Sequence, residues 1–149
     1  MKIIINESSG IEETEIVINC RKTDEQILRI CAGLRAFDRK ITGLYEEQTF
    51  LLNAADILYI ETVDRKTFLY ATDKVYETPL KLYELEERLA PDDFIRASKS
   101  CILNFGKVRS LRADFGGRLL CTLDNGEVIT VSRQYTTVIK QKLNMKGEK

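Results

Sequence analysis

Apolar and polar residues alternate in short runs along most of the chain, which is the period of strands that bury one face. The tripeptide Asp124-Asn125-Gly126 adds a strong hairpin signal near the end. We therefore expect a mostly β fold of the α+β type, with short helices. The predicted strands cover residues 1–6, 14–20, 40–52 (as a strand or a hairpin), 56–61, 66–72, 94–97, 107–112, 118–123 and 127–132.

Other segments have the period of a helix. In the first, Thr23 and Gln26 form a capping-box pair, and apolar residues recur on one face until about residue 36. The second begins with an N-cap and a proline at Thr78-Pro79 and ends at Ala90-Pro91. The remaining helical predictions are a single turn at 100–105 and a basic terminal helix at 134–143.

The order of these elements predicts two parts. Residues 1–40 form a β-β-α unit that is too small to bury a core of its own. We expect it to serve dimerisation or partner docking, or to cover an edge of the following sheet, and the sequence leaves both roles open. Residues 41–149 form the main domain.

Composition argues against an enzyme. The chain has no histidine, which excludes Ser-His-Asp and Cys-His catalysis and the histidine-based zinc motifs. The spacing of its 8 glycines matches neither of the nucleotide-binding motifs G-x-G-x-x-G and G-x-x-x-x-G-K-S/T. The remaining acid/base candidates are carboxylates on one helix face and its exit, which we interpret as solvated: Glu84, Glu86, Glu87, Asp92 and Asp93.

The cysteines predict a reducing compartment. Cys20, Cys31, Cys101 and Cys121 contain no C-x-x-C pair and have apolar neighbours, so we expect buried thiols rather than a metal site or disulfides. The first residues have too short an apolar run for a signal peptide, and no stretch approaches the length of a membrane span. We expect a cytoplasmic protein that needs no cofactor or metal and does not insert into a membrane.

Charge is segregated although the total is balanced. Residues 94–149 hold 11 basic and 4 acidic side chains, whereas residues 51–93 hold 5 basic and 10 acidic ones. A basic segment on a neutral protein is typical of a polyanion binder. A solvated sheet face followed by a basic C-terminus would give the same counts.

Cations and small hydroxyls interrupt apolar anchors in F-I-R-A-S-K-S-C-I-L-N, residues 94–104. In such a segment a short serine, Ser100, can contact phosphate while the longer Lys99 reaches a base edge. In V-S-R, Ser132 as an N-cap would project Arg133 from a strand-to-helix junction, where an arginine can contact guanine. Within residues 94–104, we expect Phe94, Ile102 and Leu103 to be buried in the core. We expect Asn104 to cap or satisfy a buried turn.

These segments together resemble a known family. The order D-I-L-Y-I-E-x-x-x-R-K-T, F-I-R-A-S-K-S-C-I-L-N and N-G-E-V-I-T-V-S-R is similar to the LytTR-type DNA-binding domain of bacterial transcription regulators, over roughly residues 41–144. The resemblance implies an elongated, multi-sheet β domain. It also implies that loops, rather than a recognition helix, enter successive major grooves and bend the DNA.

Site residues follow from matching positions. The resemblance places base-reading side chains at Lys99 and Arg133, a first contact loop at Lys66 and Thr67, and a phosphate contact at Ser100. The sequence departs from the family at Ser98, where histidine is frequent, and at Thr67, which is histidine in some members. We add Arg96 and Lys107 as further phosphate contacts.

We therefore expect a stand-alone transcription regulator that binds double-stranded DNA at paired half-sites, as a homodimer at least on DNA. A regulatory protein partner, if one exists, is not identified by the sequence. The alternative is a protein-interaction module, or an antagonist of related regulators, that does not touch DNA. The acidic balance of residues 51–93 motivates that alternative.

Overall fold

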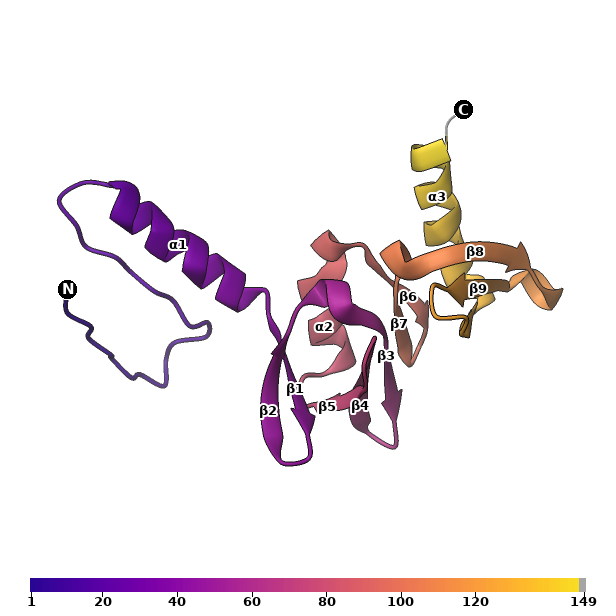
Figure 1. Cartoon of the computed structure of the whole chain (residues 1–149), viewed down its shortest axis with the longest axis horizontal. Helices are drawn as coiled ribbons and strands as arrows, with labels where there is room; N and C mark the ends of the chain where they lie inside the picture. The colour runs from indigo at the N-terminus through magenta and orange to yellow at the C-terminus, as the bar shows by residue number, and fades with distance from the viewer. Residues whose placement is uncertain (148–149) are drawn as a thin grey trace. The chain divides into compact units, whose positions relative to one another are not determined.

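The computed structural model describes the backbone of residues 1–147 and the side chains of residues 1–35 and 39–144. The chain divides into two compact units, Met1–Leu34 and Arg35–Lys149, and the division falls within helix α1 (Glu25–Asp38). Figure 1 shows the elements of both units along the chain.

The first unit has α1 as its regular element. Residues 1–24 contain neither helix nor strand, so the strands predicted at 1–6 and 14–20 are wrong. A strand needs a neighbour for its backbone groups, whereas the bonds that form here are local, such as Ile11 N–H to the Ser8 carbonyl. The helix cap is also one residue later than predicted, because Asp24 Oδ1 accepts the Ile27 N–H at 3.1 Å.

The second unit contains a seven-stranded antiparallel sheet in the order β2-β1-β5-β4-β3-β7-β6 and a three-stranded sheet in the order β10-β9-β8. The predicted hairpin at 40–52 and the strands predicted at 56–61, 66–72, 94–97, 107–112, 118–123 and 127–132 are confirmed. Its strands are β1 (Ile41–Tyr45), β2 (Gln48–Leu52), β3 (Ile57–Val63), β4 (Lys66–Ala71), β5 (Val75–Thr78), β6 (Phe94–Ser98), β7 (Cys101–Asn104), β8 (Val108–Ala113), β9 (Leu119–Leu123) and β10 (Val128–Val131).

Strands β5 and β7 differ from the prediction. We predicted a helical turn at 100–105, but β7 pairs with β3 on one side and β6 on the other, so it completes two ladders as a strand. Strand β5 occupies Thr78, and helix α2 (Leu82–Leu89) therefore begins later than predicted. At its start, Glu84 Oε1 accepts the Lys81 N–H at 2.8 Å.

The chain ends in helix α3 (Thr136–Gly147), two residues after its predicted start. A 3₁₀ turn at Arg133–Tyr135 precedes the helix and includes those two residues. The Thr136 hydroxyl donates to the Arg133 carbonyl at 2.9 Å, which joins this turn to the helix.

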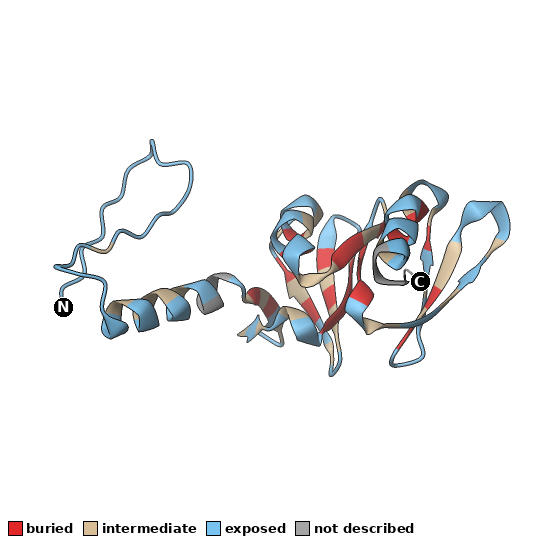
Figure 2. Ribbon diagram, turned by 90° about the horizontal axis from the view of Figure 1, so that it is seen from above, coloured by how far each residue is buried: buried red, intermediate tan, exposed pale blue. Residues whose placement is uncertain are grey.

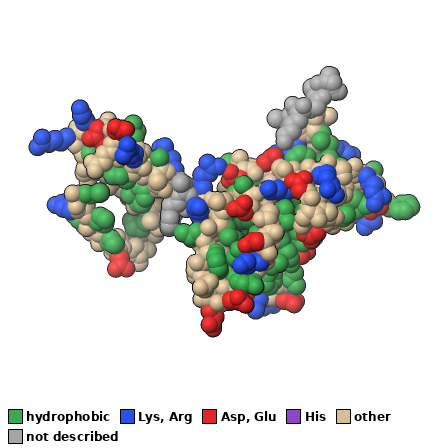
Figure 3. All heavy atoms as spheres, viewed as in Figure 1, with side chains coloured by type: hydrophobic (Ala, Val, Ile, Leu, Met, Phe, Trp, Pro, Cys, Tyr) green, Lys and Arg blue, Asp and Glu red, His purple; other side chains and the backbone are tan. Residues whose placement is uncertain are grey.

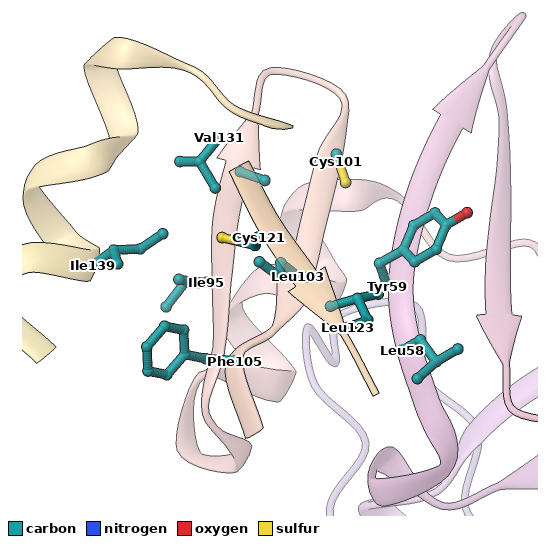
Figure 4. Packing of buried hydrophobic residues seen from close by; sticks show 11 residues of the cluster. Leu58, Tyr59, Ile95, Cys101, Leu103, Phe105, Cys121, Leu123, Val131 and Ile139 are labelled. Carbon is teal, nitrogen blue, oxygen red and sulfur yellow. The ribbon is translucent and has the colours of Figure 1, made fainter. Parts of the chain in front are cut away.

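The first four residues of β3, most of β6 and all of β7 are buried. The red segments of Figure 2 gather in the middle of the second unit. Successive residues of a strand point to opposite faces, so Ile102 joins one cluster and Leu103 the other. The first cluster packs around α2 and consists of Ile41, Ile57, Ile60, Leu69, Tyr76, Leu85, Leu89, Phe94 and Ile102. The second, drawn in Figure 4, joins the small sheet and α3 to the large sheet: Leu58, Tyr59, Ile95, Ala97, Cys101, Leu103, Phe105, Cys121, Leu123, Val131 and Ile139.

The predicted anchors of residues 94–104 are confirmed. Phe94, Ile102 and Leu103 are buried. Asn104 is also buried and satisfies two backbone groups, because its Nδ2 donates to the Ile57 carbonyl and its Oδ1 accepts the Gly106 N–H. The amide therefore fixes the end of β7 against β3.

The cysteines follow the prediction in part. Cys101 and Cys121 are buried, but Cys20 is exposed and Cys31 is half-buried, so the expectation of four buried thiols is wrong. Burial raises the pKa of the Cys101 thiol to about 12 and that of the Cys121 thiol to about 11. Within the described residues, no group of Cys, Asp and Glu side chains could hold a metal ion. Nor is any helix there long and apolar enough to cross a membrane.

Candidate nucleic-acid interface

The pairing of the large sheet brings two turns to the same end of it. Strands β3 and β4 pair up to Val63 and Lys66, where their connecting turn begins. Strand β7 pairs with the same end of β3, through Glu61 and Cys101. The Thr62 N–H also donates to the Ser100 carbonyl at 2.9 Å. The β3–β4 turn and the β6–β7 turn are therefore neighbours.

The β3–β4 turn exposes two cations. Asp64 and Arg65 have φ values of 51° and 68°, the left-handed conformation of a two-residue type I′ turn. Arg65 and Lys66 are exposed, but Thr67 is only 7% exposed, and its hydroxyl oxygen lies 3.5 Å from that of Thr62. Of the two residues predicted in this loop, Lys66 alone presents its side chain to solvent. Arg65, which we did not predict, lies beside it.

The β6–β7 turn exposes Lys99 and Ser100. Arg96 holds it from beneath, because its Nη1 donates to the Lys99 carbonyl at 2.9 Å and to the Ser98 carbonyl at 3.4 Å. Ser98 contributes a second bond, since its hydroxyl oxygen accepts the Ser100 N–H at 3.2 Å. The turn is thus fixed by side chains on its own hairpin.

Arg96 is not a freely exposed cation. Its side chain is 18% exposed, and its Nε lies 3.1 Å from Glu86 Oε1. That Nε is buried without a hydrogen-bond partner among the described residues, so the contact with Glu86 is electrostatic only. We predicted a phosphate contact here; in the structure the guanidinium of Arg96 contacts the Lys99 turn and Glu86.

The Ser132–Arg133 junction lies next to the β6–β7 turn because Ser132 is hydrogen-bonded to the Ala97 carbonyl. The β6–β7 register shifts between Arg96 and Ser98, at Ala97. The Ala97 carbonyl accepts both the Ser132 N–H at 2.8 Å and the Ser132 hydroxyl at 3.3 Å. Ser132 does stand at the N-cap position, but its hydroxyl makes this bond instead of a cap bond. The side chain of Arg133 is exposed.

A cleft of about 420 Å³ lies between the two turns and the start of α2. Arg96 and Arg65 line it, together with two other cations. Of the four cations that line the cleft, only Arg96 has an ion-pair partner among the described residues. The lining therefore has a net positive charge, which suits an anion. The full lining is Thr62, Arg65, Thr67, Lys81, Leu82, Tyr83, Arg96, Lys99 and Ser100.

A further group of exposed cations lies on the small sheet, where Figure 3 shows basic side chains over the end of β8. Arg118 forms an ion pair with Asp114, and Arg109 donates to the Asp124 carbonyl. Arg112 has no partner in the part of the chain that the structure describes. These arginines supply part of the basic charge that the sequence shows after residue 94.

Lys107 lies apart from the predicted group. The hairpin that carries Lys99 at one end pairs Phe94 with Asn104 at the other, and Lys107 follows that far end. At about 3.3 Å per residue, the four steps from Phe94 to Ser98 separate the ends by about 13 Å. The structure thus places the exposed residues Lys66, Lys99, Ser100 and Arg133 at one end of the large sheet. Thr67 and Arg96 lie behind them, and Lys107 lies near the opposite end of the β6–β7 hairpin.

This arrangement has known relatives. The family model of the LytTr DNA-binding domain matches residues 47–144, more than half of the 149 residues. The chain therefore belongs to the LytTR family of DNA-binding domains. A solved LytTr DNA-binding domain from Bacillus cereus has 27% sequence identity and a TM-score of 0.66, and the match covers 70% of this chain and 96% of that one.

Curated relatives extend the similarity to both units. An uncharacterized HTH-type transcriptional regulator of Staphylococcus aureus strain NCTC 8325 / PS 47 is 25% identical over 147 residues, which are 97% of this chain and 99% of the relative. One from strain MRSA252 is 24% identical over the same length. In this chain, strands separate each described α-helix from the next. The exposed residues Lys99, Ser100 and Arg133 lie outside the described α-helices.

Proposed function

We propose that this DNA-binding regulator reads duplex DNA with three adjacent loops: the β3–β4 turn, the β6–β7 turn and the Ser132–Arg133 junction. The observation that carries the proposal is that the three loops lie in a row at one end of the large sheet, and each presents an exposed cation. These cations are Lys66, Lys99 and Arg133. Within the described residues, none of their side chains has an ion pair or hydrogen bond.

The spacing of the row suits successive grooves. From β4 the order is β3, β7, β6 and then Ser132, bonded to β6 through Ala97. Four spacings of about 4.8 Å give about 19 Å of backbone between Lys66 and Arg133. One turn of B-DNA is about 34 Å, and two extended basic side chains cover most of the difference. Lys66 and Arg133 would then address successive major grooves, with Lys99 between them.

Each side chain has a chemical role in this proposal. The planar guanidinium of Arg133 can donate two bonds to O6 and N7 of a guanine, and Lys99 can donate to an acceptor on a base edge. The hydroxyl of Ser100 is short and stands beside Lys99, so it suits a phosphate oxygen. Lys107 remains a phosphate candidate outside the row.

We further propose that two copies bind paired half-sites. The support is that the first unit, which the curated relatives share, exposes apolar side chains that a second copy would cover. These side chains include Ile3, Ile5, Ile16, Val17 and Leu28. Sedimentation of the full chain with and without site DNA tests this: we expect the mass of two 17.1 kDa chains in the complex, and one chain per site would contradict it.

Quantitative binding tests the base readers. On a selected DNA site, Arg133→Ala is expected to cost about 1–3 kcal/mol and to relax the preference at one base pair. Arg88→Ala is the matched control, because that arginine is exposed on α2 in the second unit and does not line the cleft. Unchanged binding by Arg133→Ala would refute its assignment. A well-folded wild-type chain without sequence preference would instead favour the interaction module.

A further inference from the structure

The loop between β8 and β9 lies next to the Ser132–Arg133 junction and is held by its own hydrogen bonds and an ion pair. Its 3₁₀ turn at Phe115–Gly117 is closed by Asp114 and Arg118. The Asp114 N–H donates to the Arg118 carbonyl at 2.9 Å, and the two side chains form an ion pair at 3.0 Å. Arg118 Nε also donates to the Phe115 carbonyl at 3.1 Å. The backbone of Gly117 is therefore fixed from both sides.

The side chain of Arg133 lies directly against Gly117. A Cβ atom added at Gly117 would stand 2.9 Å from Arg133 Cγ and 3.0 Å from Cδ. Carbon atoms pack at about 3.5–4.0 Å, so such a Cβ cannot coexist with the present position of the arginine stem. Gly117 also has φ of +80°, which favours glycine at this position.

This contact limits the positions that the Arg133 side chain can take. Within the described residues the guanidinium has no hydrogen bond or ion pair of its own. Its direction therefore depends on the backbone, held by Ser132 and Ala97, and on the surface that the stem lies against. A side chain ordered before binding loses less conformational freedom on binding.

We infer that Gly117 is a positioning residue for DNA recognition, because its missing side chain lets the Arg133 stem lie on the β8–β9 loop and aims the guanidinium at its base pair. This inference rests on the proposed function of Arg133. It adds to the site a residue that contacts no DNA in our proposal and that stands 16 positions before Arg133 in the sequence.

The adjacent glycine provides the control. Gly116 has φ of +72°, but a Cβ added there meets nothing within 4 Å. Both glycines have positive φ, which disfavours alanine at either position, but only Gly117→Ala displaces the arginine. Because bidentate contacts depend on geometry, we expect Gly117→Ala to weaken binding to the selected site roughly tenfold and to relax the base pair that Arg133→Ala relaxes. Gly116→Ala should stay within about twofold of wild type.

A double-mutant cycle completes the test. In an Arg133→Ala background, Gly117→Ala should have no further effect, because the side chain that it displaces is absent. Equal effects of the two glycine variants, with Arg133→Ala still weakening binding, would overturn the inference and leave the proposed function intact. If Arg133→Ala also binds like wild type, the assignment of Arg133 fails and the inference fails with it.

One measurement needs no variant. In the free wild-type chain, the NMR order parameter of the Arg133 Nε–H group should exceed that of Arg112, which is exposed and has no partner among the described residues. Equal order parameters would overturn the inference even if Gly117→Ala does not fold.

Discussion

Replacing Arg96 by alanine is expected to destabilise the second unit and to loosen the Lys99 turn without removing a phosphate contact. Arg96 Nη1 donates to the Lys99 carbonyl at 2.9 Å, and its Nε lies 3.1 Å from Glu86 Oε1. Alanine removes both contacts and leaves space beneath the turn.

The magnitude follows from these contacts. A hydrogen bond from a charged donor contributes about 1.5–3 kcal/mol. The contact with Glu86, whose side chain is 45% exposed, adds less than about 1 kcal/mol. We therefore expect a loss of about 2–3 kcal/mol in the free energy of unfolding. For a chain of this size that lowers the melting temperature by about 4–12 °C. Lys99→Ala is the control, since exposed residues without partners change stability by about 0.5 kcal/mol or less.

The assay combines unfolding with the salt dependence of DNA binding. A residue that neutralises one phosphate contributes about −0.9 to the slope of log K against log[salt]. We expect Arg96→Ala to weaken binding with an unchanged slope, because its charge faces Glu86 and the turn rather than DNA. Wild-type stability together with a slope that is smaller by about 0.9 would refute this reasoning and restore the phosphate contact.

Two further predictions concern the core. Ile139→Ala should cost about 2–5 kcal/mol in urea unfolding because Ile139 is fully buried, whereas Val138→Ala, 44% exposed on the same helix, should cost far less. Burial raises the pKa of Cys121 to about 11, so the fold favours the protonated thiol. The contribution of the protonated Cys121 thiol to the free energy of unfolding is complete below the unfolded thiol pKa of about 8.5. It is lost as the pH rises towards 11. Urea midpoints at several pH values should therefore fall less for Cys121→Ala than for wild type, and parallel curves would contradict this.

Much of the second unit was predictable because its strands have a clear period. Alternation placed β4 and the hairpins, since one-sided burial leaves that pattern in the sequence. Strands β3 and β6 are buried on both faces but stand out as short apolar runs beside polar turns. Strand β7 is buried on both faces as well, and its four residues Cys101–Asn104 resemble a helical turn equally well. Residues 1–24 alternate without forming strands, because pattern alone supplies no neighbouring strand.

The exposure of the candidate site residues was predictable where a short motif contained them and unpredictable where strand pairing decided it. Lys99 and Arg133 followed from short motifs, and both are exposed. The burial of Thr67 follows from its pairing with Thr62 and Thr78 in a sheet that no single segment encodes. The proximity of Gly117 to Arg133 was not predictable, because the two residues are 16 positions apart in the sequence.

The most direct test of DNA reading is selection from a random duplex pool at about 0.15 M salt, with wild type and the Lys99→Ala/Arg133→Ala double variant in parallel. We predict that wild type enriches a motif of two half-sites about one helical turn apart, and that the double variant enriches none. No motif from well-folded wild type, or the same motif from the double variant, would contradict recognition through this end of the large sheet.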